Sequence, residues 1–260
     1  MCEVRRMRSH TRELQVAREA VVRAGRITLQ YFRKGVDVER KPDQTPVTIA
    51  DRRAEESLRT ALRDAFPHDG FLGEEYGEEA GTSGRRWIID PIDGTQSFIR
   101  GVPLYGVLVG LEEEGRCVVG ICGLPALGQT YWAAEGEGAW CDGERIAVAP
   151  TTDLAQATLL TTDARPAHYG DKHPGYERLL RATARQRGWG DCWGYALVAS
   201  GAADVMVDPL LNPWDAAALV PIVEEAGGAF FAWSGEVSIY AGSGIAAPRA
   251  LRDPVLALLR

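Results

Sequence analysis

The run Trp87-Ile88-Ile89-Asp90-Pro91-Ile92-Asp93-Gly94-Thr95 constrains the fold more than any other part of the sequence. Its first three residues are apolar and contiguous, which is typical of a buried strand. The strand would deliver Asp90 at its carboxyl end, where a carboxylate can project into a crevice beyond a sheet. Pro91 fixes the turn that follows, and Gly94 permits a backbone angle that other residues rarely adopt. The segment therefore predicts a buried strand that ends in an acidic turn.

This acidic turn offers the ligands that a magnesium ion prefers. Asp90 and Asp93 supply hard carboxylate oxygens, and Ile92 supplies a backbone carbonyl. Thr95 and the residues after it can begin a helix, whose first N–H groups attract phosphate oxygens. Asp-Pro and Asp-Gly are also common turn dipeptides, so either pair alone favours an ordinary turn. The complete hexapeptide after an apolar strand favours a metal site.

The composition excludes several other classes of protein. The 260-residue chain is 45% hydrophobic and 25% charged, as ordinary globular proteins are. No apolar run reaches the roughly 18 residues that span a bilayer, and the basic N-terminus has no apolar segment after it. We therefore expect no membrane partner, no secretory signal and a cytoplasmic location. The net charge of −7 argues against a nucleic-acid partner. Five cysteines without C-x-x-C spacing predict reduced thiols and no zinc site.

The order of the predicted elements indicates a mixed α/β fold. Apolar residues at helical spacing predict helices over 9–32 and 49–66. Short apolar runs predict strands in the middle of the chain, at 71–72, 87–89, 104–111, 117–124, 129–134 and 138–141. The acidic, Gly-rich stretch 77–84 is expected to be a loop.

After residue 151 the pattern changes to alternating strands and helices. The strands are expected at 157–161, 204–207, 230–231 and 245–246, and the helices at 175–187, 195–201, 214–226 and from 248 onward. We therefore expect an N-terminal α+β subdomain over 1–150 and a C-terminal α/β subdomain over 151–260.

Three further acidic segments are each a weak indication of a functional site when taken alone. Gly73-Glu74-Glu75 is by default an acidic surface loop. In Asn212-Pro213-Trp214-Asp215, the aspartate has the alternative role of stabilising a helix dipole from its first turn. Asp51 by itself is typical of an acid near a helix N-terminus.

Together with residues 90–95, these segments resemble the inositol monophosphatase superfamily. They occur in the family's order and approximate spacing, and the resemblance covers nearly the whole chain. The segments are Asp43-Gln44-Thr45-Pro46-Val47-Thr48-Ile49-Ala50-Asp51, Gly73-Glu74-Glu75, Asp90-Pro91-Ile92-Asp93-Gly94-Thr95 and Trp214-Asp215-Ala216-Ala217. The resemblance implies a layered α/β/α/β/α sandwich of the inositol monophosphatase and fructose-1,6-bisphosphatase type. It also implies Mg²⁺-dependent phosphomonoester hydrolysis with two or three ions per site, and a homodimer.

The resemblance assigns roles to individual residues. The implied metal ligands are Glu74, Asp90, Asp93, Asp215 and the Ile92 carbonyl. Asp51 and Thr95 would orient the attacking water, and Glu74 would also count among the catalytic residues. The N–H groups of Gly94 and Thr95 would bind the phosphate, and Asp93 would contact the substrate as well. A non-catalytic metal- or anion-binding homologue is the alternative from another class, and the presence of every expected ligand disfavours it.

Two later stretches, 97–103 and 187–195, are more similar to the histidinol-phosphatase branch than to the inositol branch. The inositol branch usually has a small neutral residue where this chain has Asp191. Asp208 lies where the family places an acid that contacts the substrate. Two extra carboxylates would suit histidinol phosphate, an intermediate of histidine biosynthesis, because it carries an ammonium and an imidazole.

Alternatives to this substrate assignment stay open. Asp191 would have a purely structural role if it belonged to a capped turn before the helix at 195–201. Arg187 is a further candidate for contact with a substrate or structural carboxylate. Inositol 1-phosphate or a broader set of sugar phosphates is the alternative substrate within the same superfamily.

Overall fold

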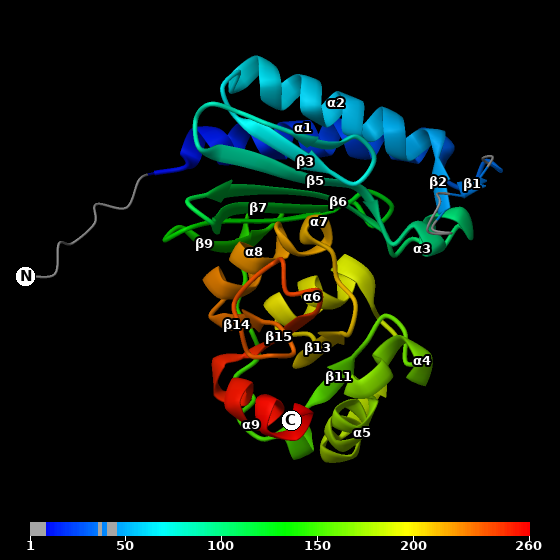
Figure 1. Cartoon of the computed structure of the whole chain (residues 1–260), viewed down its shortest axis with the longest axis vertical. Helices are drawn as coiled ribbons and strands as arrows, with labels where there is room; N and C mark the ends of the chain where they lie inside the picture. The colour runs from blue at the N-terminus through cyan, green and yellow to red at the C-terminus, as the bar shows by residue number, and fades with distance from the viewer. Residues whose placement is uncertain (1–8, 36–37, 41–45) are drawn as a thin grey trace, which may run out of the picture.

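The computed structural model describes residues 9–35, 38–40 and 46–260 and stacks them in layers of helix, sheet, helix, sheet and helix (Figure 1). These layers confirm the predicted sandwich. The outer layer at the top of the figure contains α1 (Thr11–Tyr31) and α2 (Ile49–Ala65). Residues 1–8 and the motif residues Asp43, Gln44 and Thr45 lie outside the described part. No helix in the described ranges combines the length and apolarity that crossing a bilayer would need.

The first sheet lies directly beneath α1 and α2. Its strands are β3 (Gly70–Gly73), β4 (Gly77–Glu79), β5 (Arg85–Asp93), β6 (Gly106–Glu113), β7 (Arg116–Leu124), β8 (Gln129–Ala134), β9 (Gly138–Cys141) and β10 (Glu144–Arg145). Their spatial order is β10-β9-β8-β7-β6-β5-β3-β4. β3 and β5 are parallel, and the other neighbours are antiparallel. A separate short hairpin pairs β1 (Val38–Arg40) with β2 (Pro46–Thr48).

The second sheet is built from residues beyond 150. Its strands are β11 (Thr158–Leu160), β12 (Arg185–Arg187), β13 (Val205–Asp208), β14 (Gly228–Phe231) and β15 (Gly244–Pro248), in the spatial order β12-β11-β13-β15-β14. Between the sheets lie α6 (Asp191–Ala199), α7 (Pro213–Ala216) and α8 (Leu219–Glu225). On the far side lie α4 (Pro166–Tyr169), α5 (His173–Ala182) and α9 (Arg249–Leu259). Because each sheet uses one half of the chain, we propose the subdomain division at residue 150.

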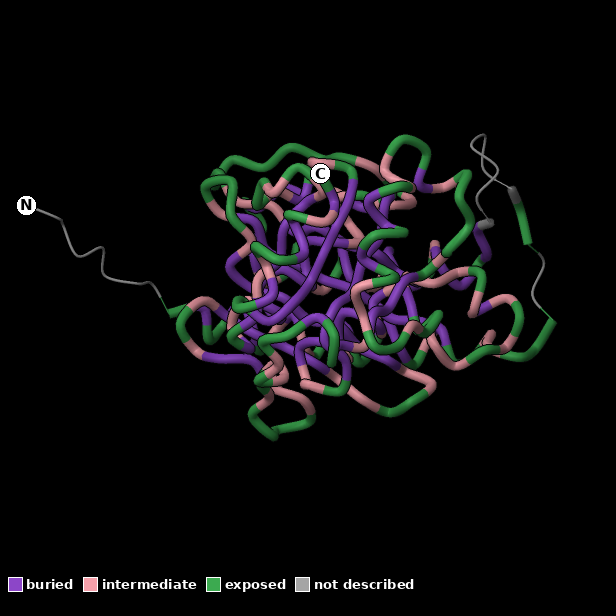
Figure 2. Tube along the Cα trace, turned by 90° about the horizontal axis from the view of Figure 1, so that it is seen from below, coloured by how far each residue is buried: buried purple, intermediate pink, exposed green. Residues whose placement is uncertain are grey.

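The middle helices approach the first sheet unusually closely. A Cβ on Gly120 of β7 would lie 2.0 Å from the Ala218 carbonyl oxygen, and one on Gly110 of β6 would lie 2.6 Å from the Ala217 carbonyl carbon. Glycine at both positions therefore lets α7 and α8 rest against the strands. Buried chain fills the centre of the molecule and exposed chain lies mainly at its periphery (Figure 2).

Some predicted elements differ from the structure. The helix expected over 214–226 is divided into α7 and α8, since Pro221 has no N–H to donate to the Ala217 carbonyl. The helix expected over 175–187 ends at Ala182, because residues 185–187 pair with β11 as β12. The stretch 77–84, expected to be a loop, begins with β4, whose Gly77 carbonyl accepts a hydrogen bond from Arg59.

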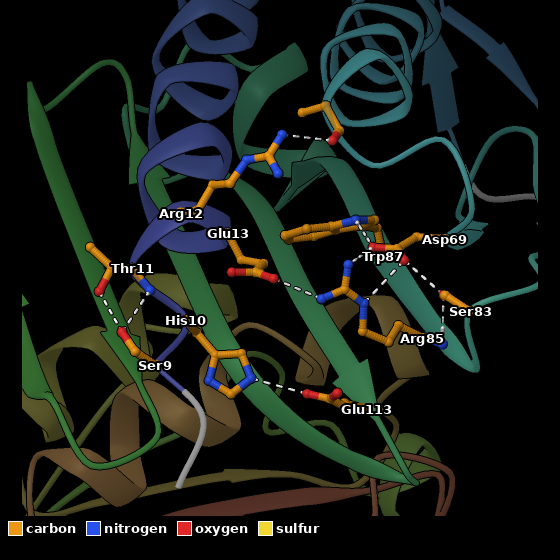
Figure 3. Close-up of polar contacts among 11 residues, drawn as sticks. Ser9, His10, Thr11, Arg12, Glu13, Asp69, Ser83, Arg85, Trp87 and Glu113 are labelled. Atoms are coloured by element: carbon orange, nitrogen blue, oxygen red, sulfur yellow. Dashed lines mark hydrogen bonds and ion pairs between the residues drawn. The ribbon is translucent and has the colours of Figure 1, made fainter.

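A buried ion-pair network fixes the start of β5 (Figure 3). The Arg85 guanidinium donates to both carboxylate oxygens of Asp69, at 3.0 and 2.9 Å, and to Glu13 of α1 at 2.7 Å. Asp69 also accepts hydrogen bonds from Ser83 at 2.7 Å and from the Trp87 indole at 3.1 Å. The network ties the strand to α1 at the end opposite Asp90 and Asp93.

Asp69→Ala tests the energetic weight of this network. The substitution should lower the free energy of unfolding by about 3 kcal/mol, because it leaves Arg85 and the Trp87 N–H short of buried acceptors. Urea denaturation measures the change. Glu177→Ala is the control, since its ion pair with Arg181 is exposed and 3.9 Å long, and it should change stability by less than about 0.5 kcal/mol. If the two variants lose the same free energy of unfolding, the buried network has no special weight in stability.

Candidate functional site

A bulge in β5 brings two acids to one face of the sheet. Asp90 pairs with Leu108 of β6 and Asp93 pairs with Gly106, so β5 has one residue more than β6 over this interval. In a regular strand, residues three apart point to opposite faces. The extra residue cancels that alternation and places both carboxylates on the side of α7. The structure therefore confirms the predicted strand and shows that it continues through its acidic turn.

The turn after the bulge is held by local hydrogen bonds. The Ile92 N–H donates to Oδ1 of Asp90 at 2.9 Å, and the Thr95 hydroxyl donates to the Ile92 carbonyl at 3.1 Å. Gly94 has φ +81°, and a Cβ there would lie 3.0 Å from the Leu104 carbonyl oxygen and 3.0 Å from Oδ2 of Asp191. Only glycine fits this position without strain. α3 (Thr95–Ile99) begins directly after it.

Asp215 completes an acidic cluster from the other half of the chain. It lies in α7, where its Oδ2 accepts the Asn212 N–H at 2.8 Å and thereby caps the helix. Asp90, Asp93 and Asp215 each place one carboxylate oxygen within 4.8 Å of the others. Such a group of hard oxygens fits a divalent cation such as Mg²⁺ or Ca²⁺.

The electrostatics of the cluster also favour a cation. Burial, followed by the charges of Glu74, Asp93 and Asp215, raises the pKa of Asp90 well above its usual range. Burial and then Asp191 and Asp215 likewise raise the pKa of Asp93, against the hydrogen bonds from Cys192. Adjacent buried carboxylates repel one another unless protons or cations neutralise them.

Glu74 joins this group through the parallel pairing of β3 with β5. Gly73 pairs with Ile89, so Glu74 follows beside Asp90, and its N–H donates to the Ile89 carbonyl at 3.2 Å. Glu74 lines the same cavity as the three aspartates.

Asp51 is buried in the first turn of α2. Its Oδ2 accepts hydrogen bonds from the Thr48 N–H at 2.8 Å and the Thr48 hydroxyl at 2.6 Å, and so forms a capping box. Burial raises its pKa to about 6, against these bonds and with the charges of Glu75 and Glu74. Asp51 is therefore a helix-capping acid, as its position in the sequence indicates. Its proposed catalytic role remains a prediction.

Glu74 and the aspartates of the cluster line a cavity of about 380 Å³, whereas Asp51 is not part of its lining. Of the predicted site residues, the cavity brings together Glu74, Asp90, Ile92, Asp93, Gly94, Thr95, Asp191 and Asp215. A smaller adjoining cavity of about 80 Å³ adds Asp208 and Tyr195 and shares four lining residues with the first, namely Asp93, Thr162, Asp191 and Asp215. Arg187 lies exposed on β12, where its Nη1 donates to the Gln186 carbonyl at 2.7 Å, and it lines neither cavity.

Asp191 occupies a strained position at the start of α6. Its φ of +51° is rare for a residue other than glycine, although aspartate tolerates it better than most. Its N–H donates to the Thr162 hydroxyl at 2.8 Å, and the next N–H, of Cys192, donates to Asp93 at 2.5 Å. The helix begins earlier than predicted and carries no side-chain cap, so the capped turn considered for Asp191 is not what its contacts show. Burial, followed by the charge of Asp215, raises the pKa of Asp191 to about 6.

Asp208 ends β13 and is buried. Its Oδ1 accepts the Thr162 N–H at 3.2 Å. Burial raises its pKa to about 7, with an added contribution from Asp191 and against the bonds from Thr162 and Tyr195. Thr162 thus contacts both acids, and sequence reasoning missed it because a single threonine after a strand carries no motif.

Comparison with known proteins identifies the family. The inositol monophosphatase family model matches residues 10–260. The chain is 47% identical to a histidinol-phosphatase from Chlorobaculum parvum, covering 90% of this chain and 91% of that protein. It is 39% identical to a histidinol-phosphatase from Mycobacterium tuberculosis, covering 95% and 97%. An inositol monophosphatase structure from Zymomonas mobilis superposes with a TM-score of 0.86 at 32% identity, covering 97% and 99%. The chain belongs to the inositol monophosphatase family and is a phosphatase of that superfamily.

The raised pKa values predict how the metal-free protein responds to pH. Asp208 titrates at about 7 when folded, whereas an aspartate in an unfolded chain titrates near 4. The folded state therefore binds more protons, and its stability falls as the pH rises through 7. Between pH 6 and 8 this carboxyl alone should account for a loss of about 1 kcal/mol.

Thermal unfolding in EDTA at pH 6 and pH 8 measures this loss. Asp208→Asn should reduce the difference between the two conditions, because asparagine keeps an acceptor for Thr162 without the titration. Asp171→Asn, at an exposed position, is the control and should leave the difference unchanged. If the stability difference between pH 6 and pH 8 is unchanged in Asp208→Asn, Asp208 is not the group that causes it.

Proposed function

We propose that this phosphatase hydrolyses L-histidinol phosphate and acts in histidine biosynthesis. The observation that carries the proposal is the small cavity beside the acidic cluster, which is lined by Asp191 and Asp208. An ammonium or imidazolium group there would favour the ionised form of both carboxyls and offset their charge, whereas a neutral polyol would offset none of it. The names of the two sequence relatives support the same substrate.

We propose Mg²⁺ as the cofactor, with two or three ions per site. Glu74, Asp90, Asp93, Asp215 and the Ile92 carbonyl would hold them, as the grouped hard oxygens support. Bound Mg²⁺ supplies charge neutralisation for the phosphoryl group and lowers the pKa of a nearby water molecule.

The chain's own residues would orient the reactants. The Thr95 hydroxyl donates its hydrogen bond to the Ile92 carbonyl, so its lone pairs remain available to accept a hydrogen bond from the attacking water. Asp51, whose pKa is about 6, is a carboxylate at neutral pH and would accept the proton of that water, with Glu74 beside it. The N–H groups of Gly94 and Thr95 would hold the phosphate at the start of α3. Asp93 would contact both metal and substrate.

We also propose that the protein is cytoplasmic, and that it is a homodimer, as the family resemblance implies. Light scattering of the purified protein tests the dimer. Arg187 remains a predicted substrate contact without support from the two cavities.

A panel of phosphate esters tests the reaction and the substrate together. With Mg²⁺, histidinol phosphate should have a higher kcat/KM than inositol 1-phosphate and glycerol 2-phosphate. Without Mg²⁺, no ester should be hydrolysed. Asp93→Asn should lose at least about a hundredfold in kcat, because the cluster loses a charged ligand. Equal or better turnover of inositol 1-phosphate would overturn the substrate, and turnover in EDTA would overturn the metal dependence.

Asp191→Asn separates recognition from catalysis. It should lower kcat/KM for histidinol phosphate by about tenfold or more, since a hydrogen bond to a charged group contributes about 1.5–3 kcal/mol. Glycerol 2-phosphate hydrolysis should change much less. Asp163→Asn is a matched control, because this acid lines the same cavity but is already paired with Arg165 at 2.7 Å. A uniform loss across all esters would contradict the recognition role.

A further inference from the structure

The turn that follows β3 is held from the side of α2 by a carboxylate that no motif includes. Glu55 lies on α2, one helical turn after Asp51, and its side chain is 0% exposed. Its Oε2 accepts the Glu75 N–H at 2.9 Å, and its Oε1 accepts the Tyr76 N–H at 3.4 Å. These two N–H groups belong to the residues directly after Glu74, so one carboxylate holds the backbone of the turn that presents Glu74 to the cavity.

Arg59 completes the support from the next turn of α2. Its Nε donates to Oε1 of Glu55 at 2.8 Å, and its Nη2 donates to the Gly77 carbonyl at 2.5 Å. The two side chains therefore hold the turn at both ends: Glu55 accepts the Glu75 N–H, and Arg59 donates to the Gly77 carbonyl. Arg59 is 6% exposed, so the two charges are withdrawn from water together.

Gly73 shows that the chain makes room for this carboxylate. A Cβ on Gly73 would lie 1.9 Å from Oε1 of Glu55 and 2.5 Å from its carboxyl carbon. Any other residue would force Glu55 out of its place. The glycine of the Gly73-Glu74-Glu75 motif is thus explained by Glu55 rather than by its own backbone conformation.

Burying a carboxylate is costly, and the paired Arg59 guanidinium offsets that cost here. The carboxylate suits this contact because it offers two acceptor oxygens and can accept several N–H bonds at once. A glutamine has one carbonyl oxygen, and its NH₂ group would face another donor.

We propose that Glu55 is a positioning residue that fixes the peptide chain around Glu74 and so sets the affinity of the acidic cluster for a divalent cation. This inference rests on the proposed role of Glu74 as a metal ligand. Residues that orient a metal ligand typically change metal affinity by about 10- to 100-fold when they are replaced.

Calorimetric titration of the EDTA-treated full-length protein with Mg²⁺ and with Mn²⁺ tests the proposal. Glu55→Gln should weaken binding about tenfold or more, and raise the Mg²⁺ concentration needed for half-maximal hydrolysis to the same degree. At saturating Mg²⁺, the KM for the ester should stay near that of the unchanged protein. Glu56→Gln is the matched control, since this neighbour is exposed, and it should change neither quantity. Unchanged metal affinity in folded Glu55→Gln would overturn the proposal, because a merely structural residue changes only the stability.

A double-mutant cycle with Glu74→Gln shows whether Glu55 acts through Glu74. If it does, Glu55→Gln should add little to the loss of metal affinity already caused by Glu74→Gln. If the losses of metal affinity in the two single variants add fully in the double variant, Glu55 does not act through Glu74. If Glu74→Gln alone leaves metal affinity unchanged, the ligand assignment itself fails. If Glu74→Gln weakens binding and Glu55→Gln does not, only the present inference fails.

Arg59→Lys tests the positioning role of Glu55 if Glu55→Gln does not fold. A lysine keeps the charge beside Glu55 but cannot bond both Glu55 and the Gly77 carbonyl in the fixed geometry of a guanidinium. The variant should weaken Mg²⁺ binding in the same direction, and unchanged affinity in the folded variant would overturn the proposal.

Discussion

The extra residue in β5 between Asp90 and Asp93 is the constraint on which the rest of the site depends. Without it, one of the two carboxylates would point into the apolar layer beneath α1 and α2. Pro91 suits the interruption because it has no N–H to donate to β6. Ile92 is directed instead into a small apolar cluster with Ala50, Phe98 and Tyr105. The same irregularity thus turns the acids toward α7 and anchors the turn between them.

Several acids of the site are held by the same kind of hydrogen bond. In four of them, one carboxylate oxygen accepts a backbone N–H: that of Ile92 for Asp90, Cys192 for Asp93, Asn212 for Asp215 and Thr48 for Asp51. Each bond fixes a rotamer and partly offsets burial. Glu55 supports the turn at Glu74 in the same way, by accepting N–H groups. Repulsion among the acids remains, so the strands that carry them must be rigid enough to withstand it. The Arg85 network and the close contacts at Gly110 and Gly120 stiffen the strands that carry these groups.

Local signals in the sequence were sufficient for the strand at 87–89, the acidic turn after it, and the helices α1 and α2. They failed where a distant partner decides the structure. Residues 185–187 contain good helix formers, yet they pair with β11 as an edge strand. That pairing also carries Arg187 away from the cavities, although it lies only four residues before Asp191. Glu55 and Thr162 act through backbone groups about 20 and 29 residues away, and no local pattern reveals such contacts.

Asp191, the proposed substrate contact, and the acidic cluster are connected at the start of α6. The helix begins with Asp191 in a strained conformation, and its next N–H donates to Asp93 of the acidic turn. Strain of this kind persists only where surrounding contacts enforce it, and here Thr162 and Asp93 provide them. A change in α6 that relaxes Asp191 therefore also releases a bond to Asp93. Asp208 is different, because its contacts run to Thr162 and Tyr195 rather than to the cluster. If both acids have the recognition roles proposed above, a substitution at the end of β13 would thus disturb the acidic cluster less than one at the start of α6.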